Sequence, residues 1–232
     1  MMARILAAAG VLCASAAVVA DQKFSTKRLS QAKKGYYEAK SSYPAFSGRG
    51  IVLALANGEI AKEARADFGR FVNEAKQEAR FGRPTAAWGY EATTVVALAT
   101  DSLVSVYFDR YSYSGGAHPN TFQLPLNFGL VAGKAKRLKL EDVLKPGSAG
   151  VVMSQIVRPR LNAAKGARGG DPIETIDKDL NNSFVVTRAG MTWLFPAYSV
   201  GPYAEGSYEI KVPWSDLAPH LAAGGPLSSV RR

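Results

Sequence analysis

Two long alternating segments, adjacent in the sequence, constrain the fold more than any other feature. Residues 88–99 and 102–113 alternate in side-chain character with a period of two, and Thr100-Asp101 joins them. Such a period is typical of strands whose two faces meet different surroundings. A short connection between two strands brings them together as an antiparallel pair. We therefore expect an antiparallel sheet at the centre of the chain.

The second strand ends at a polar corner, residues 114–120. Gly115 and Gly116 can adopt positive φ without a steric penalty, so the chain can turn sharply there. Pro119 fixes its own φ and favours an extended His118, which stiffens the loop. A tyrosine-rich strand that ends in a rigid polar corner indicates a recognition surface, although it is not a catalytic signature.

Residues 1–20 predict a secretory signal peptide. Arg4 is followed by an apolar run and then by small residues before Asp21. The run is too short to span a bilayer comfortably. We predict cleavage after Ala20 and a mature protein that is secreted or periplasmic. Lipidation of Cys13 is the alternative, but Leu12 stands where such sites need a small side chain.

Composition limits the chemistry of the mature protein. Cys13 is the only cysteine, so disulfides, thiolate chemistry and cysteine metal sites are excluded after cleavage. The net charge of +10 includes Arg4 of the signal peptide, which leaves +9 on the mature chain. Such a charge favours anionic partners, which outside the cytoplasm are envelope polymers and lipid head groups rather than nucleic acid. The alternative is that the charge only keeps the protein soluble.

Apolar periodicity and turn residues predict the other elements. The face of the first helix that carries Lys62, Glu63 and Asp67 is expected to be solvated. In chain order the predictions are a flexible basic lead-in over 21–35, strands over 36–40 and 51–55, a helix from Asn57 to about Arg80, a strand over 121–130, a helix over 151–164 interrupted near Pro159, a flexible joint over 165–170, a short helix over 177–180, strands at 184–186 and around Trp193 and Tyr208, and a last helix over 216–221.

Long strands that follow one another, with helices inserted between them, predict an α+β fold. We expect antiparallel sheets, each covered by helices, in two small packed lobes. A mature chain of about 210 residues is long enough for two small cores. We expect a monomer without a transmembrane segment after signal removal. The predicted parts are the signal peptide 1–20, the lead-in 21–35, an N-terminal lobe 36–100, a C-terminal lobe 101–222 and a tail 223–232.

Three motifs in this order resemble the C-terminal domain of the lysozyme-sensing anti-sigma factor RsiV. They are YSGGAHPN at residues 113–120, LKLEDVL at 138–144 and PYAEG at 202–206. The same module accompanies the catalytic domain of the peptidoglycan deacetylase PdaC, and residues 36–75 resemble the smaller domain that precedes it. The resemblance implies an extracytoplasmic α+β module that binds or senses a component of the cell envelope. Membrane signalling and deacetylation belong to further segments of those relatives, which we do not find in this sequence.

The two glycine corners and their tyrosines supply the candidate binding residues. Tyrosine rings are amphipathic and suit sugar rings or protein pockets, although they also cap the edges of cores. His118 is a metal ligand or general base in one interpretation and a structural loop residue in the other, which we favour. The candidate binding residues are Tyr111, Tyr113, Gly115, Gly116, His118, Pro119, Asn120, Tyr198, Pro202, Tyr203, Glu205 and Gly206.

No residue pattern predicts a cofactor, a metal or a catalytic site. His118 and His220 are the only histidines, too few for a zinc site, which needs three or four ligands. Asp109 and Glu205 form a glycosidase pair only if the fold brings them to the separation that such chemistry requires. We expect a non-catalytic binding or sensing module for cell-wall polysaccharide or an envelope protein. One alternative is an inhibitor or sensor of lysozyme-like muralytic enzymes, which is disfavoured because lysozymes are also basic and would repel this chain. The other is an envelope glycan hydrolase that uses Glu205, Asp109 and His118.

Overall fold

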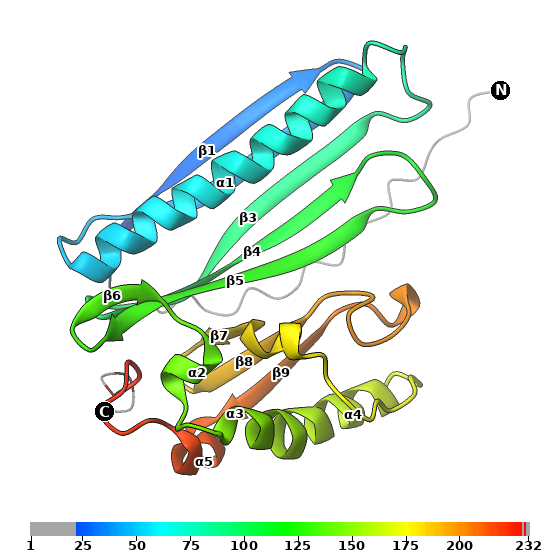
Figure 1. The fold of residues 1–232 in the computed structure, drawn as a ribbon. Coiled ribbons are helices and arrows are strands. Elements are labelled where there is room, and N and C mark those ends of the chain that lie inside the picture. The colour runs from blue at the N-terminus through cyan, green and yellow to red at the C-terminus, as the bar shows by residue number, and fades with distance from the viewer. Residues whose placement is uncertain (1–21, 229, 231–232) are drawn as a thin grey trace.

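The structure of the chain, a computed structural model, describes residues 22–228 and residue 230. The predicted signal peptide, its cleavage site and Cys13 lie outside these residues. Within them the strands form a large sheet of six strands and a small sheet of three. Figure 1 shows helix α1 lying along the large sheet, with the small sheet and the other helices below it. The predicted α+β fold with packed lobes is therefore confirmed.

The large sheet has the order β1-β2-β3-β4-β5-β6. It is mixed rather than wholly antiparallel, because β2 and β3 are parallel while every other neighbouring pair is antiparallel. Helix α1 carries the chain from the end of β2 back to the start of β3, as a parallel pair requires. Its elements are β1 (Phe24–Lys33), β2 (Tyr37–Phe46), α1 (Ile51–Glu78), β3 (Trp88–Ala99), β4 (Leu103–Tyr113), β5 (Asn120–Val131) and β6 (Lys134–Arg137).

The basic segment expected to be a flexible lead-in instead supplies β1. This strand pairs with β2 along its whole length, from Phe24 opposite Phe46 to Lys33 opposite Tyr37. Gly35 turns the hairpin with a φ of 77°, which favours glycine. Because β1 lies at the edge of the sheet and is exposed along most of its length, its sequence shows no apolar alternation. Its lysines are typical of an edge strand that must not pair with other chains.

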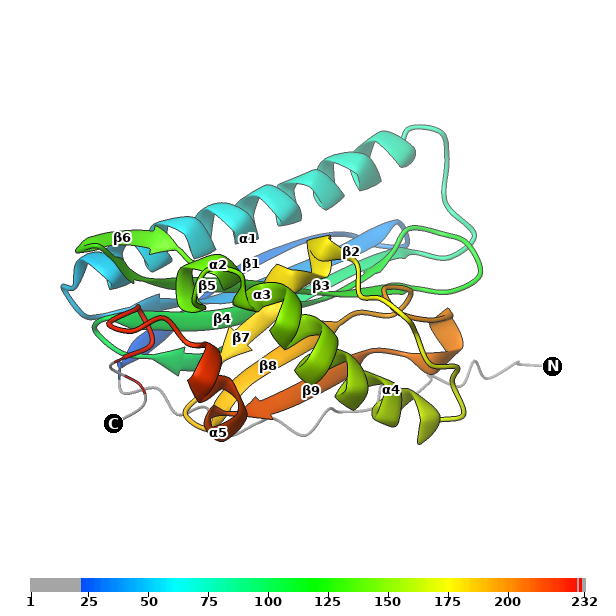
Figure 2. The same cartoon turned by 60° about the horizontal axis from the view of Figure 1, so that its bottom comes forward.

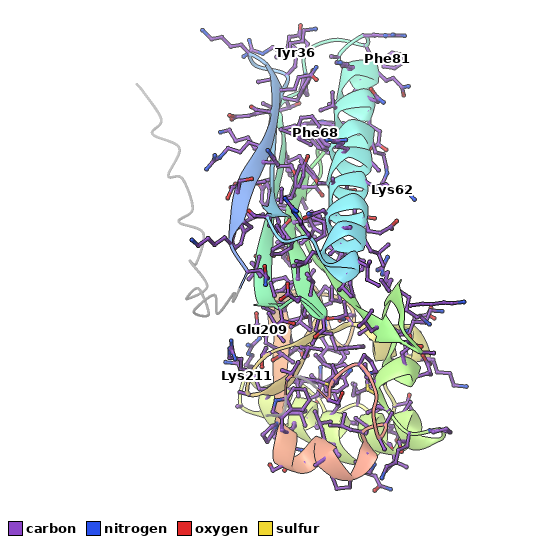
Figure 3. The ribbon with its side chains drawn as sticks, turned by 90° about the vertical axis from the view of Figure 1, so that its left-hand side faces the viewer. Tyr36, Lys62, Phe68, Phe81, Glu209 and Lys211 are labelled. Carbon is purple, nitrogen blue, oxygen red and sulfur yellow. The ribbon has the colours of Figure 1, made fainter. Side chains whose placement is uncertain are left out.

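Helix α1 begins at Ile51, so the strand expected over residues 51–55 is wrong. The apolar residues there continue the helical spacing of the buried face instead of ending it. Asn57, where the helix was predicted to begin, lies inside α1. Its side-chain amide donates to Phe46 O (2.9 Å) and its Oδ1 accepts from Phe46 N (2.8 Å), so it holds the end of β2 against α1. In Figure 3 Phe68 points toward the sheet and Lys62 points away from it.

The charged face of α1 is not wholly solvated as predicted. Asp67 is buried, and its carboxylate lies 2.9 Å from Arg110 Nε of β4 and accepts a 2.7 Å hydrogen bond from the Tyr90 hydroxyl. Arg110 also pairs with Glu63 at 2.9 Å. Burial, followed by the hydrogen bond to Asp67, raises the pKa of Tyr90. These contacts fasten α1 to the sheet through charge as well as through apolar packing.

The second lobe is built on the small sheet, with the order β7-β8-β9 and antiparallel pairs throughout. Figure 2 shows α3 and α4 lying across one face of this sheet. None of the helices in residues 22–228 and 230 is long and apolar enough to cross a membrane. The elements are α2 (Leu140–Val143), α3 (Ser148–Val151), the π-helix η1 (Val152–Val157), α4 (Arg158–Gly166), the 3-10 helix η2 (Lys178–Asn182), β7 (Phe184–Val186), β8 (Gly190–Phe195), the 3-10 helix η3 (Tyr203–Glu205), β9 (Tyr208–Pro213), α5 (Trp214–Leu217) and the 3-10 helix η4 (Ala218–His220).

The helix predicted over residues 151–164 runs without a gap through α3, η1 and α4. Pro159 does not break it, but the preceding turns are π-helical, as proline has no N–H for the helical ladder. Arg158 Nε donates to Ser154 O (3.3 Å) and Arg160 Nη1 donates to Ile156 O (3.0 Å). The arginines beside the proline thus bond carbonyls in the distorted turns.

The two lobes share a buried polar joint. Ser105 Oγ of β4 donates to Asn127 Oδ1 of β5 at 2.7 Å, and it accepts from Val186 N of β7 at 2.7 Å. Asn127 Nδ2 donates to Phe184 O at 2.7 Å. Two side chains of the large sheet therefore satisfy the backbone edge of β7. The boundary expected at residue 100 falls between β3 and β4, so the large sheet takes strands from both predicted lobes.

Candidate functional site

The two predicted corners come together at the junction of the lobes. The first is the loop between β4 and β5, and the second is the connection between β8 and β9. His118 of the first stacks on Tyr203 of the second, with ring centroids 4.0 Å apart and planes 17° apart. The Tyr198 ring lies 5.3 Å from that of Tyr203. We call His118, Tyr198 and Tyr203 the aromatic cluster.

Hydrogen bonds fix the orientation of the cluster. Pro119 O lies 2.9 Å from His118 Nδ1 and accepts a 3.1 Å bond from the Tyr203 hydroxyl. A carbonyl only accepts, so Nδ1 carries a proton. In a neutral ring Nε2 then accepts the 3.1 Å bond from the Tyr198 hydroxyl. Both ring nitrogens of His118 are thus bonded within the protein. This agrees with the interpretation of His118 as a structural loop residue.

Tyr198 is accessible to solvent although its hydroxyl is bonded to His118. The residue is 59% exposed, the largest exposure of any tyrosine among the described residues. Its φ of 69° lies in the left-handed region, which is strained for a residue with a Cβ atom. Strained residues of this kind persist where the surrounding structure imposes them and are frequent at binding sites.

A groove runs from the aromatic cluster along the junction of the lobes, and we call it the junction groove. Its volume is about 560 Å³. Tyr198 and Ser199 form one wall, Phe122, Gln123 and Leu124 of β5 form the other, and Leu180 of η2 also lines it. Strand β6 pairs with β5 only from Phe128 onward, so this part of β5 borders the groove with an edge that no described strand covers.

Two features of the junction groove point to a ligand. Phe122, which lines both this groove and the small cavity on the α1 side of the sheet, is 49% exposed, so an apolar ring is open to solvent at this edge of β5. Gln123 Oε1 is buried and has no hydrogen-bond partner among residues 22–228 and 230. A buried acceptor without a partner is costly, and such groups need an explanation in a native structure. A hydroxyl or amide donor in the groove would supply the missing bond.

Glu205 lies beside the cluster but serves the fold of the second corner. Its carboxylate accepts 2.6 Å and 2.7 Å hydrogen bonds from Lys165 Nζ and the Tyr208 hydroxyl. These two bonds hold the pKa of Glu205 below its ordinary value. Lys165 is almost fully buried and also donates to Val200 O at 2.7 Å. The basic joint expected to be flexible is therefore anchored at Lys165.

Close backbone approach makes room for this ion pair. A Cβ atom on Gly201 would lie 2.6 Å from a carboxylate oxygen of Glu205 and 2.7 Å from Lys165 Nζ. A Cβ atom on Gly170 would lie 2.7 Å from the same carboxylate. A side chain at either position would displace members of the ion pair. Arg168 adds bonds to the backbone oxygens of Glu205 (3.0 Å) and Ser207 (2.8 Å), so the corner is rigid.

The other predicted residues lie at or near the two corners but not in the aromatic cluster. Tyr113 donates to Gly116 O at 3.2 Å, and Gly115 and Gly116 have φ values of 93° and 98°, so they shape the first loop. Asn120 faces a small cavity beside Asp67 on the α1 side of the sheet. Tyr111 is exposed on the opposite face of the sheet, and Pro202 and Gly206 flank η3.

The proposed carboxylate pair of Asp109 and Glu205 has separate surroundings. Although the side chain of Asp109 is exposed, loss of hydration and then the charge of Glu209 raise its pKa. Glu205 is bonded to Lys165 and Tyr208 instead. No group of three or more potential metal ligands occurs among the described residues.

Sequence reasoning missed Phe122, Gln123 and Lys165. The first two were placed on a strand, where alternation indicates a face but not an opening beside it. Lys165 sits in a run of small and basic residues that resembles a surface joint. Its partner Glu205 is 40 residues away, so nothing local indicates the pair.

Two families account for most of the described chain. Residues 30–121, from β1 into β5, match the family model described as Deacetylase PdaC. Residues 141–215, from α2 into α5, match the family model described as Protein of unknown function (DUF3298). The predicted resemblance to PdaC is confirmed, whereas the resemblance to RsiV stays a prediction. No curated protein matches the chain.

Two solved structures have a similar fold. A DUF3298 family member from Bacteroides fragilis NCTC 9343 has a TM-score of 0.58 and 18% identity, covering 91% of this chain and 98% of its own. A DUF3298 family protein from Pseudomonas aeruginosa PAO1 has a TM-score of 0.51 and 19% identity, covering 87% of this chain and 96% of its own. At these identities the likeness shows the fold alone.

Proposed function

We propose that the chain is an exported, non-catalytic module that binds a glycan of the cell envelope in the junction groove. The observation that carries the proposal is Gln123 Oε1, a buried acceptor without a partner in a groove with two exposed rings, Phe122 and Tyr198. A sugar presents apolar ring faces and hydroxyl donors together. Aromatic side chains match the faces, and Gln123 matches a hydroxyl.

The geometry of the groove favours an extended chain over a compact ligand. It runs along the uncovered edge of β5 from the aromatic cluster toward Arg137, whose guanidinium lies 3.5 Å from Pro125 O. An elongated groove that is open to solvent can hold several units of a polymer. The net charge of +10 for the whole chain adds long-range attraction for the acidic polymers of an envelope.

The surroundings of Glu205 support binding rather than hydrolysis. A general acid of a glycosidase needs a raised pKa, so that it is protonated near neutral pH. The bonds from Lys165 and Tyr208 lower the pKa of Glu205 instead. A carboxylate held in this way accepts hydrogen bonds and orders the corner, and it does not donate a proton to a leaving group.

Binding can be tested by sedimenting the mature chain, residues 21–232, with isolated peptidoglycan at low and moderate salt. We expect retention that survives moderate salt, since stacking and hydrogen bonds are screened less than net charge. Tyr198→Ala and Phe122→Ala are expected to weaken retention at least about tenfold, as central aromatic contacts do. Tyr111→Ala is the matched control, because that ring is exposed but does not line the junction groove.

Gln123→Leu separates function from stability. It removes an acceptor that has no partner within the described structure, so the fold should keep its stability or gain up to about 1–3 kcal/mol. Retention on the glycan should fall nevertheless. Retention that is unchanged in Gln123→Leu and Tyr198→Ala, or that disappears fully at moderate salt, would contradict the proposal. Retention only on immobilised lysozyme would favour a sensor or inhibitor instead.

Export has its own test. We expect the protein recovered from outside the cytoplasm to begin at Asp21, because small residues precede that position. Sequencing of its N-terminus, with Ala20→Asp as the variant that blocks cleavage, checks this. A cytoplasmic protein that begins at the initiating methionine would contradict it.

A further inference from the structure

A second groove lies on the opposite side of the junction, and we call it the outer groove. It has a volume of about 400 Å³, within the usual range for small-ligand sites. Val95 and Ala97 of β3 line one side, and Val185 and Leu194 of the small sheet line the other. Neither the aromatic cluster nor the junction groove contributes a residue to it. It is therefore a separate site from the one described above.

Charged side chains border the outer groove in a segregated arrangement. Arg188 lies in the turn between β7 and β8. Lys211 lies near the same turn, because it pairs with Thr192 close to the start of β8. Glu209 lies two residues further along β9, and its charge reaches Asp109 of β4. Figure 3 shows Glu209 and Lys211 on the side of the molecule away from α1. One end of the groove is positive and the other is negative.

From these features we infer that the outer groove binds a short, extended peptide with an apolar side chain and free termini. The apolar side chain occupies the groove among Val95, Val185 and Leu194. The ammonium group lies at Glu209, and the carboxylate lies at Lys211.

The spacing of the charges fits a peptide of this size. Glu209 and Lys211 are two residues apart on one face of β9, which corresponds to about 6.8 Å. The termini of an extended tripeptide lie about 7–10 Å apart by the same rise per residue. A longer peptide would place at least one terminus beyond its partner. Charge complementarity thus selects the length as well as the direction of the ligand.

The test uses the mature chain and the tripeptide Ala-Leu-Ala, followed by amide chemical shifts in an NMR titration. We expect shifts at residues 187–194 and 209–213. Acetylation of the amine or amidation of the carboxylate should each weaken binding about two- to fivefold, as expected for a partly exposed ion pair. Replacement of the central leucine by serine should weaken it more than about tenfold, since an apolar side chain is no longer buried.

Variants of the chain complete the test. Glu209→Lys and Lys211→Glu should each weaken binding of Ala-Leu-Ala, whereas Lys62→Glu, an exposed charge on the far side of α1, should not. Val95→Trp fills the groove and should abolish binding while the melting temperature shows that the fold persists. Tyr198→Ala should leave peptide binding unchanged, which separates this inference from the glycan proposal.

Three outcomes would overturn the inference. The first is shifts of equal size for Ala-Leu-Ala and its blocked or serine forms. The second is shifts confined to residues outside the outer groove. The third is tighter binding of an uncharged apolar probe such as toluene at the same residues, because the charged ends would then have no role.

Discussion

Tyr198 shows how one residue can oppose stability and serve binding. Its φ of 69° is unfavourable for tyrosine or alanine but not for glycine. Tyr198→Gly and Tyr198→Ala both remove the ring and its contacts with His118 and Tyr203. We expect the glycine variant to be more stable than the alanine variant by about 1 kcal/mol, measured by urea denaturation. Equal stabilities would mean that the backbone relaxes when the ring is lost.

Glu205 makes the stability of the second corner depend on pH. Its pKa is lowered in the folded protein by the bonds from Lys165 and Tyr208, so the ionised form is the stabilising one. This contribution is present above the ordinary glutamate pKa of about 4.3 and is lost as the pH falls through the lowered value. Thermal unfolding between neutral pH and about pH 3 should therefore show the difference between the wild type and Glu205→Gln shrinking in acid.

The control for this experiment is Glu78→Gln at the exposed end of α1, which should follow the wild type. A difference between the wild type and Glu205→Gln that stays constant with pH would contradict the role of the charge.

For individual residues, the sequence predicts where the two corners lie but not which distant residues they contact. Gly115, Gly116 and Pro119 define a turn by their own backbone preferences, so the first corner could be predicted locally. The stack of His118 on Tyr203 joins residues 85 positions apart only by way of the fold. Gln123 Oε1 differs from any other strand glutamine only in what surrounds it. Such features depend on tertiary packing, which a single sequence does not display.

Among the elements, α1 depends on a buried ion cluster for its position. Asp67 meets Arg110 and Tyr90 beneath the helix, and only 13% of the Arg110 side chain is exposed. Removal of Asp67 leaves Arg110 paired with Glu63 and leaves the Tyr90 hydroxyl without the carboxylate that accepts its hydrogen bond. We expect Asp67→Ala to lower the free energy of unfolding by about 1–3 kcal/mol. Chemical denaturation measures this loss.

Glu74→Ala, exposed on the same helix, should change the stability by no more than about 0.5 kcal/mol. If Asp67→Ala changed the stability as little as Glu74→Ala, water or a neighbouring acid would be compensating the charge of Arg110.

Elements with one buried face could be predicted, and elements without one could not. Strands β3, β4 and β5 have buried segments, and their predicted bounds agree with the structure to within a residue or two, although β4 and β5 each contain a run of consecutive buried residues rather than an alternation. Strand β1 is exposed on both faces, so its sequence is that of a flexible basic segment. The start of α1 was misjudged because a short apolar run fits a strand as well as a buried helical turn.

For the whole molecule, the polar joint between the sheets predicts unfolding as a single unit. Ser105 and Asn127 of the large sheet bond the backbone of β7, and Leu98 and Leu103 belong to the core of the second lobe. Asn127→Ala leaves Phe184 O without its donor and should cost about 1–3 kcal/mol. Calorimetry should show one transition that moves to a lower temperature.

Gln77→Ala, an exposed amide on α1, is the control and should leave the transition in place. Two separate transitions in the wild type would show instead that the lobes unfold independently.

The parallel pairing of β2 with β3 has a consequence for the order of folding. Strands β1 and β2 are joined by a tight turn and can meet within microseconds, about 1–10 μs for a hairpin. Tyr37 of β2 meets Trp88 of β3 only after the whole of α1 has been made and docked. A chain that emerges from a ribosome or an export channel N-terminus first thus shows the apolar face of its first hairpin, with Tyr37 and Tyr43, well before its cover arrives. This interval is when the nascent chain most needs a chaperone to keep it from aggregating.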